Sequence, residues 1–119
     1  MKLRWCAILV KDLDESIKFY QEIIGLPAPA RFPAGPGMEI ALFDTGCAEL
    51  ELIHKADIPN PVAGNALSIG FEVASIEDAM AHVKEKGIEI ERGPVISPRA
   101  KFFFIRDPNG VEVELKQAD

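Results

Sequence analysis

An internal repeat constrains the fold of this chain more than any other feature. The segment FDTGCAELEL (residues 43–52) and the segment RDPNGVEVEL (residues 106–115) share an acidic residue, a turn and a strand with alternating glutamates. Asp44 and Asp107 lie 63 residues apart in sequence, and the same offset relates Glu49 to Glu112 and Glu51 to Glu114. Such a repeat predicts two similar modules in one short chain.

The offset also relates the starts of two predicted helices. Asp12 and Ser75 are good helix N-caps, and each is followed three residues later by an acid that completes a capping box. The helices that follow have matching apolar faces, formed by Leu13, Ile17 and Tyr20 in the first and by Ile76, Met80 and Val83 in the second. Each module is therefore expected to run strand, helix and three strands.

The expected elements give an α+β domain built from two βαβββ modules. The first module, residues 1–53, has strands at 3–10, 28–33, 37–43 and 47–53 and a helix at 13–24. The second, residues 67–119, has strands at 67–73, 88–96, 101–106 and 111–116 and a helix at 76–86. Residues 54–66, which contain two prolines and a glycine, are the expected linker.

Composition narrows the class of protein and its partners. The 119 residues suit one domain, and no apolar run is long enough for a membrane span. The net charge of -6 argues against nucleic acid or an anionic membrane surface as a partner. The two cysteines match no zinc spacing. We expect a cytoplasmic protein whose partners are small molecules, cations or other proteins.

Strand alternation separates an inner face from a face that carries the glutamates. In VEVEL, the apolar residues must face the helix, so Glu112 and Glu114 face the other way, and the same argument turns Glu49 and Glu51 outward. The first strand of each module also contributes residues to the glutamate face. These are Trp5 and Ala7 in the first module and Ser68 and Gly70 in the second.

This glutamate face has two interpretations. It is either the wet side of a half-exposed sheet or the wall of a pocket. Trp5 favours the pocket because a large aromatic side chain seldom faces open water, and the small residues Ala7 and Gly70 leave space beside it. In KFFFIRD, Phe103 faces opposite to Phe102 and Phe104. Alternation does not say which side is concave. We assign at least two of the three to the core and place Phe103 in the pocket.

Two segments, VKDLDESIKFYQEIIGL (residues 10–26) and RDPNGVEVEL, resemble the vicinal oxygen chelate superfamily of glyoxalases, bleomycin-resistance proteins and extradiol dioxygenases. The resemblance implies that each module folds its sheet into a half-barrel around a concave pocket. It also implies four metal-binding positions, which fall on Trp5, Glu51, Ser68 and Glu114. Many metal-binding relatives have histidine where this chain has Trp5 and Ser68.

The missing histidines argue against a bound transition metal. Trp5 has only an N–H donor, and two carboxylates with a hydroxyl make a weak site at best. The two histidines of the chain, His54 and His82, are expected to be surface residues. We therefore expect no metal cofactor, with a weak divalent metal at Glu51 and Glu114 disfavoured.

The expected function is the binding or sequestering of a small cationic or aromatic ligand. This is the role of metal-free bleomycin-resistance proteins, which the acidic composition resembles. The alternative is an enzyme resembling lactoylglutathione lyase, a lyase or isomerase that uses Glu51 and Glu114 as an acid–base pair or as weak metal ligands. A regulatory or protein-binding role is the third class. We expect a homodimer, and the sequence leaves open whether modules pair within a chain or between chains.

Overall fold

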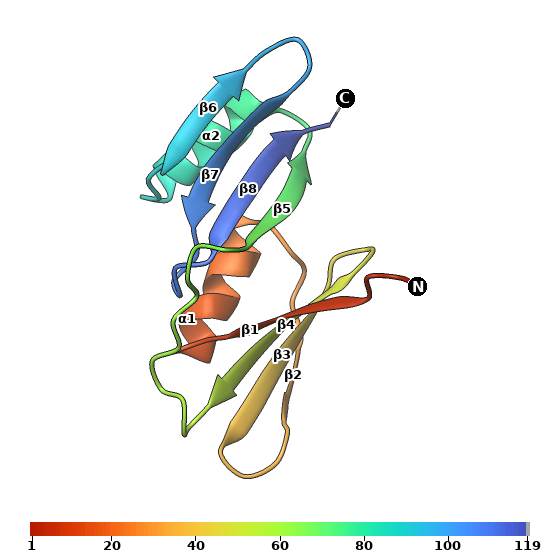
Figure 1. Ribbon diagram of the computed structural model, residues 1–119, viewed down its shortest axis with the longest axis vertical. Coiled ribbons are helices and arrows are strands. Elements are labelled where there is room, and N and C mark those ends of the chain that lie inside the picture. The colour runs from red at the N-terminus through yellow and green to blue at the C-terminus, as the bar shows by residue number, and fades with distance from the viewer. Residues whose placement is uncertain (119) are drawn as a thin grey trace. The chain divides into compact units, whose positions relative to one another are not determined.

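The computed structural model describes residues 1–118. The chain separates into two compact units, Met1–Ala63 and Gly64–Asp119. The division between them falls inside the expected linker. Each unit contains a sheet and a helical segment, which can be followed in Figure 1.

The first unit contains a four-stranded mixed sheet. Its elements in chain order are β1 (Trp5–Leu9), α1 (Leu13–Lys18), η1 (Phe19–Ile23), β2 (Ala30–Pro33), β3 (Met38–Asp44) and β4 (Glu49–Lys55). The strands are ordered β1-β4-β3-β2, with β1 parallel to β4 and the other neighbours antiparallel. The expected helix 13–24 is thus an α-helix that continues into a wider π-turn, in which the Ile24 N–H donates to the Phe19 carbonyl.

The second unit repeats this arrangement. Its elements are β5 (Ser68–Val73), α2 (Ile76–Glu85), β6 (Arg92–Ile96), β7 (Lys101–Arg106) and β8 (Glu112–Gln117). The strand order β5-β8-β7-β6 matches that of the first sheet, and α2 lies behind the sheet in Figure 1. The α+β class and the two βαβββ modules are confirmed.

The helix starts follow the local sequence. The Asp12 carboxylate accepts from the Glu15 N–H at 3.0 Å, and the Ser75 hydroxyl accepts from the Asp78 N–H at 3.2 Å. Each bond satisfies a donor that the first helical turn leaves without an intrahelical partner. After each helix, a connecting segment leads the chain to the next strand, β2 in the first unit and β6 in the second.

Each unit buries one face of its sheet against its own helix. The core of the first unit includes Val10, Tyr20, Phe43 and Leu52, and that of the second includes Ile76, Val83, Ile105, Val113 and Leu115. The opposite face of each sheet carries the glutamates, and we call these two surfaces the open faces. No helix among residues 1–118 has the length and apolar run that a transmembrane span requires.

Candidate functional site

The open face of the first unit contains the tryptophan and two of the glutamates. In the parallel pair β1 and β4, Trp5 lies opposite Glu49 and Ala7 lies opposite Glu51. This register places the four residues on one face, as alternation predicts. Trp5 is 62% exposed in the chain. Its ring is therefore available to pack against another molecule.

The two carboxylates on this face are not neutralised within the described chain. Neither Glu49 nor Glu51 has a side-chain hydrogen bond or ion pair to any of residues 1–118. The neighbouring β3 contributes Leu42, which lies opposite Glu51, and Asp44, which lies opposite Glu49. The surface is therefore acidic and partly apolar, a combination that suits a cation with an apolar body.

The open face of the second unit places Ser68 opposite Glu112 and Gly70 opposite Glu114. A hollow of about 340 Å³ lies here, and it is lined by Gly70, Phe71, Glu72, Glu114, Lys116, Gln117 and Ala118. A Cβ atom added at Gly70 would lie 3.5 Å from Glu114 Oε1. The absence of a side chain at Gly70 thus keeps one side of the Glu114 carboxylate open.

Glu114 and Glu112 differ in what they contact. Glu114 has no side-chain hydrogen bond or ion pair among residues 1–118. Glu112 lies between two arginines: Arg92 Nη2 donates to its Oε1 at 2.9 Å, and Arg106 Nη2 lies 3.7 Å from its Oε2. Of the two β8 glutamates, Glu114 is therefore the one available to a ligand.

Arg106 is itself paired with a second carboxylate. Its Nε donates to Glu91 Oε2 at 2.5 Å, and its Nη1 donates to the Gly110 carbonyl at 2.9 Å. The bond from Arg106 lowers the pKa of the Glu91 carboxyl, with smaller contributions from the charges of Arg106 and Arg92, and the same bond raises the pKa of Arg106. Four charges therefore alternate along this face in the order Glu91, Arg106, Glu112, Arg92.

The placement of Phe103 in the pocket was wrong, and so was the assignment of at least two of the three phenylalanines to the core. Phe103 is fully buried and lies opposite Leu115, on the face that packs against α2. Phe102 and Phe104 lie on the open face instead, where Phe104 is opposite Glu114 and the two rings meet edge-to-face with centroids 5.8 Å apart. The pairing of Glu114 and Leu115 with β7 determines which phenylalanines face the core, and alternation within one strand cannot predict that pairing.

Sequence reasoning also missed Arg92, whose guanidinium carbon lies 3.9 Å from the centre of the Phe104 ring. Arg92 is opposite Phe104 in the pairing of β6 with β7, and the register shifts between Arg92 and Val95. Gly93 makes this irregularity possible, with φ +87° and too little space for a side chain against the backbone of Phe102 and Phe103. The Gly-Pro pair in RGPVI is a signal for such a bulge.

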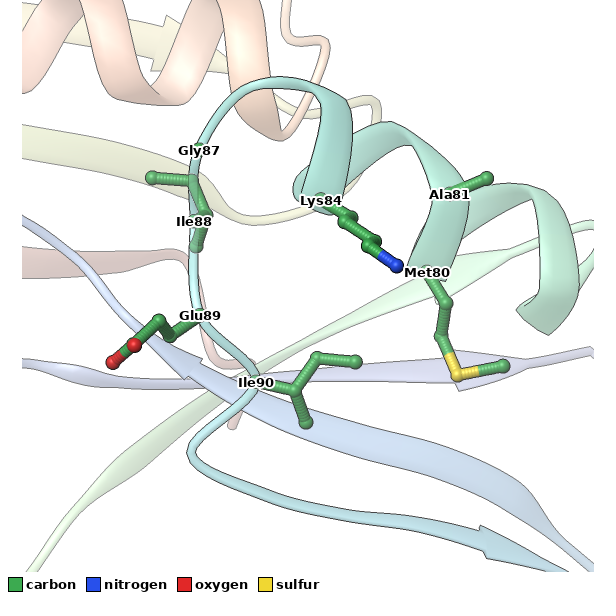
Figure 2. Close-up of a pocket in the computed structure, with 7 residues that line it drawn as sticks. All are labelled: Met80, Ala81, Lys84, Gly87, Ile88, Glu89 and Ile90. Atoms are coloured by element: carbon green, nitrogen blue, oxygen red, sulfur yellow. The ribbon is translucent and has the colours of Figure 1, made fainter.

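Another groove in the second unit contains none of the expected site residues. It lies between the end of α2 and the segment that follows it (Figure 2), and it is lined by Met80, Ala81, Lys84, Gly87, Ile88, Glu89 and Ile90. The lining is mostly apolar, with Lys84 and Glu89 as its charged groups. It is on a different part of the unit from Glu112 and Glu114.

The residues at the four positions where the resemblance implies metal ligands do not fit a transition metal. Glu51 lies opposite Ala7, and Trp5, which lies opposite Glu49 on the same face, offers an indole rather than an imidazole. Glu114 lies opposite Gly70, and Ser68, opposite Glu112, offers only a hydroxyl. Residues 1–118 contain no group of three or more His, Cys, Asp and Glu side chains arranged to hold an ion. The Nδ1 atom of His54 lies 3.3 Å from the Val10 carbonyl, on the helix side of β4.

Two βαβββ units, each with an open sheet face carrying glutamates, define the class of protein. Residues 2–115 match the model of the glyoxalase, bleomycin resistance protein and dioxygenase superfamily, and the chain belongs to this family. The resemblance on residues 10–26 and 106–115 is thereby confirmed.

Named relatives in this family have different activities. The chain is 30% identical to a lactoylglutathione lyase of Neisseria meningitidis, over 98% of this chain and 91% of that protein. It is also 30% identical to the mitochondrial methylmalonyl-CoA epimerase of Homo sapiens, over 98% of this chain and 74% of that protein. The structure of TnmS3, an antibiotic-binding protein from Streptomyces sp. CB03234, has the same fold, with a TM-score of 0.76, 21% identity and coverage of 100% of this chain and 97% of that one.

Proposed function

We propose that this protein binds a small cationic or aromatic molecule on the open sheet face of its first unit without a metal ion. The observation that carries the proposal is the group formed by Trp5, Glu49 and Glu51, an exposed indole beside two carboxylates that have no partner among residues 1–118. A cation over an indole face gains about 0.5–2 kcal/mol, more when water is excluded, and nearby carboxylates add to this attraction.

Two further facts support the proposal, the first concerning the metal and the second concerning the small molecule. The inherited positions Trp5 and Ser68 lack the imidazoles that Zn, Ni or Co sites use. A neighbour of the same fold, TnmS3, is described as an antibiotic-binding protein. At 21% identity this neighbour supports the fold's capacity for small molecules and does not identify the ligand.

Trp5 provides a direct test because it is the only tryptophan in the chain. We expect benzyltrimethylammonium and larger aromatic cations to change its fluorescence and to raise the melting temperature, since a ligand that binds the native state stabilises it. Glu51→Gln should weaken the binding by about tenfold, the effect of losing one charge-assisted contact.

The matched control is Glu85→Gln, which removes an exposed carboxylate at the end of α2 in the other unit. It should leave the titration unchanged. If no cation in the panel alters the Trp5 fluorescence, or if Glu51→Gln binds as well as the wild type, the proposal is wrong.

A proton-transferring enzyme is the second candidate, and Glu114 is the observation that favours it. The carboxylate has no partner among residues 1–118, faces a hollow of about 340 Å³ and has Gly70 beside it. A general base needs such a carboxylate within reach of the substrate proton. The lyase and epimerase relatives make this chemistry reasonable to test. If the candidate is correct, formation of lactoylglutathione should fall by at least about a hundredfold in Glu114→Gln, while Glu112→Gln should retain more of the activity.

A further inference from the structure

The open face of the second unit differs in charge from that of the first. The first has carboxylates without cationic partners, whereas the second has Arg92, Arg106 and Lys116 among its glutamates. The duplicate of Glu49 is Glu112, and only Glu112 is paired with arginine. The two modules therefore do not offer a ligand the same chemistry.

Arg92 is held in place but keeps most of its donors. Its guanidinium stacks on the Phe104 ring at 3.9 Å and donates from Nη2 to Glu112 at 2.9 Å. Among residues 1–118, Glu112 is the only acceptor it has. A guanidinium has five N–H donors in a planar fork, so the Nε edge and Nη1 are available. The side chain is 58% exposed, and a ligand can reach those donors.

The charge of Arg92 is only partly compensated. Arg106 is paired mainly with Glu91, at 2.5 Å, but it also lies 3.7 Å from Glu112, so that Glu112 is shared between the two arginines. Arg92 is the terminal member of the chain of four charges. A planar guanidinium that is fixed by stacking loses little side-chain entropy when it binds a carboxylate or phosphate through two parallel hydrogen bonds.

The surroundings of Arg92 indicate the rest of the ligand. Phe102 and Phe104 are both half-buried on the open face, and Phe104 lies opposite Glu114. An apolar or aromatic group can therefore pack beside the guanidinium. The carboxylate of Glu114 would repel a second negative charge, which favours a ligand with a single anionic group at this place.

We propose that Arg92, stacked on Phe104, forms an anion-binding subsite that takes the carboxylate or phosphate of a ligand with an adjoining apolar part. This proposal rests on the proposed function in one respect only: a ligand binds to an open sheet face. Its test is separate, because it is read at Arg92 in the second unit and not at Trp5.

The experiment titrates the full chain with benzoate and with its neutral analogue benzamide, and follows the Nε–H resonance of Arg92 by NMR. We expect benzoate to shift this resonance and to bind at least about tenfold more tightly than benzamide. Phenyl phosphate in place of benzoate distinguishes a preference for phosphate from one for carboxylate. Equal binding of benzoate and benzamide by the wild type would overturn the proposal without any variant.

Variants test whether the planar guanidinium of Arg92 is the group that binds benzoate. Arg92→Gln should lower benzoate affinity by at least about tenfold, and Arg92→Lys should recover only part of it because an ammonium lacks the planar fork. Arg99→Gln, which removes an exposed arginine of the same unit, should bind benzoate as the wild type does. If Arg92→Gln binds benzoate normally, or if Arg99→Gln loses binding equally, Arg92 is not the subsite.

Discussion

Trp5 stands at a position where the resemblance to the family implies a metal ligand. It lies on β1 next to β4, where its ring shares a face with Glu51. An indole cannot ligate a metal, whereas an imidazole at the same place can. The identity of this one side chain therefore determines whether β1 can offer a metal ligand at this position.

Replacing Trp5 by histidine should give the first unit affinity for zinc or nickel. Calorimetry should show at least about tenfold tighter binding than for the wild type, because an imidazole is added to the carboxylates of Glu49 and Glu51. Trp5→Phe is the control, since it removes the indole and adds no ligand. Stoichiometric metal in the wild type, or equal affinities in the histidine and phenylalanine variants, would contradict the argument.

Glu91 allows a prediction about pH. Because the bond from Arg106 lowers its pKa, the pair stabilises the fold above the carboxyl's unfolded pKa, and this contribution is lost as the pH falls through the lower folded value. Carboxyl NMR should therefore find that the Glu91 midpoint rises when Arg106 is replaced by Gln. An unchanged midpoint would mean that the pair does not form in solution.

At the scale of elements, β7 shows how one strand serves two surfaces. Phe103 and Ile105 are fully buried, whereas Phe102 and Phe104 face the open side. The pleat requires this separation, because neighbouring side chains in a strand point to opposite faces. The side chains on the helix side of β7 pack in the core, and on the open side the Phe104 ring packs against the guanidinium of Arg92.

Truncating a side chain should lower the free energy of unfolding more on the helix side of β7 than on its open side. Phe103→Ala should lower the free energy of unfolding by about 3–5 kcal/mol, because it removes a buried ring and leaves a cavity. Phe102→Ala should cost clearly less, since its ring is partly exposed. Urea denaturation of both variants makes the comparison, and equal losses would mean that Phe103 is not in the core.

At the scale of the whole molecule, exposed apolar side chains favour self-association. Trp5, Leu67 and Ile96 are 62%, 81% and 55% exposed, and β1, β2, β5 and β6 are edge strands in their sheets. Unpaired edges with apolar neighbours are surfaces that proteins usually cover. We propose that a second copy of the chain covers part of them.

Light scattering tests this proposal. A homodimer should have twice the 13.0 kDa mass of one chain and should dissociate on dilution only below about micromolar concentration. Ile96→Asp, which places a charge on the β6 edge, and Leu67→Asp both change the second unit, so weaker dimerisation of either variant would place the contact in that unit. A 13.0 kDa particle at micromolar concentration would refute the dimer.

The sequence by itself determined the features that depend on short-range patterns. The offset between Asp44 and Asp107 revealed the two modules, Asp12 and Ser75 marked the helix starts, and alternation placed Glu51 and Glu114 on the open faces. Each of these follows from spacing along one segment, where sterics and backbone hydrogen bonding fix the geometry. Family membership followed from two such segments.

Only the tertiary structure decided which side of β7 is open and which glutamates are neutralised. Phe103 was misplaced because its face depends on the register with β8, which lies on another strand. The stack of Arg92 on Phe104 depends on the register between β6 and β7 and on the bulge at Gly93. Pairing between strands is set by the packing of whole faces rather than by the residues of one strand. The charge partners that distinguish Glu112 from Glu114 therefore emerge only when the sheet is assembled.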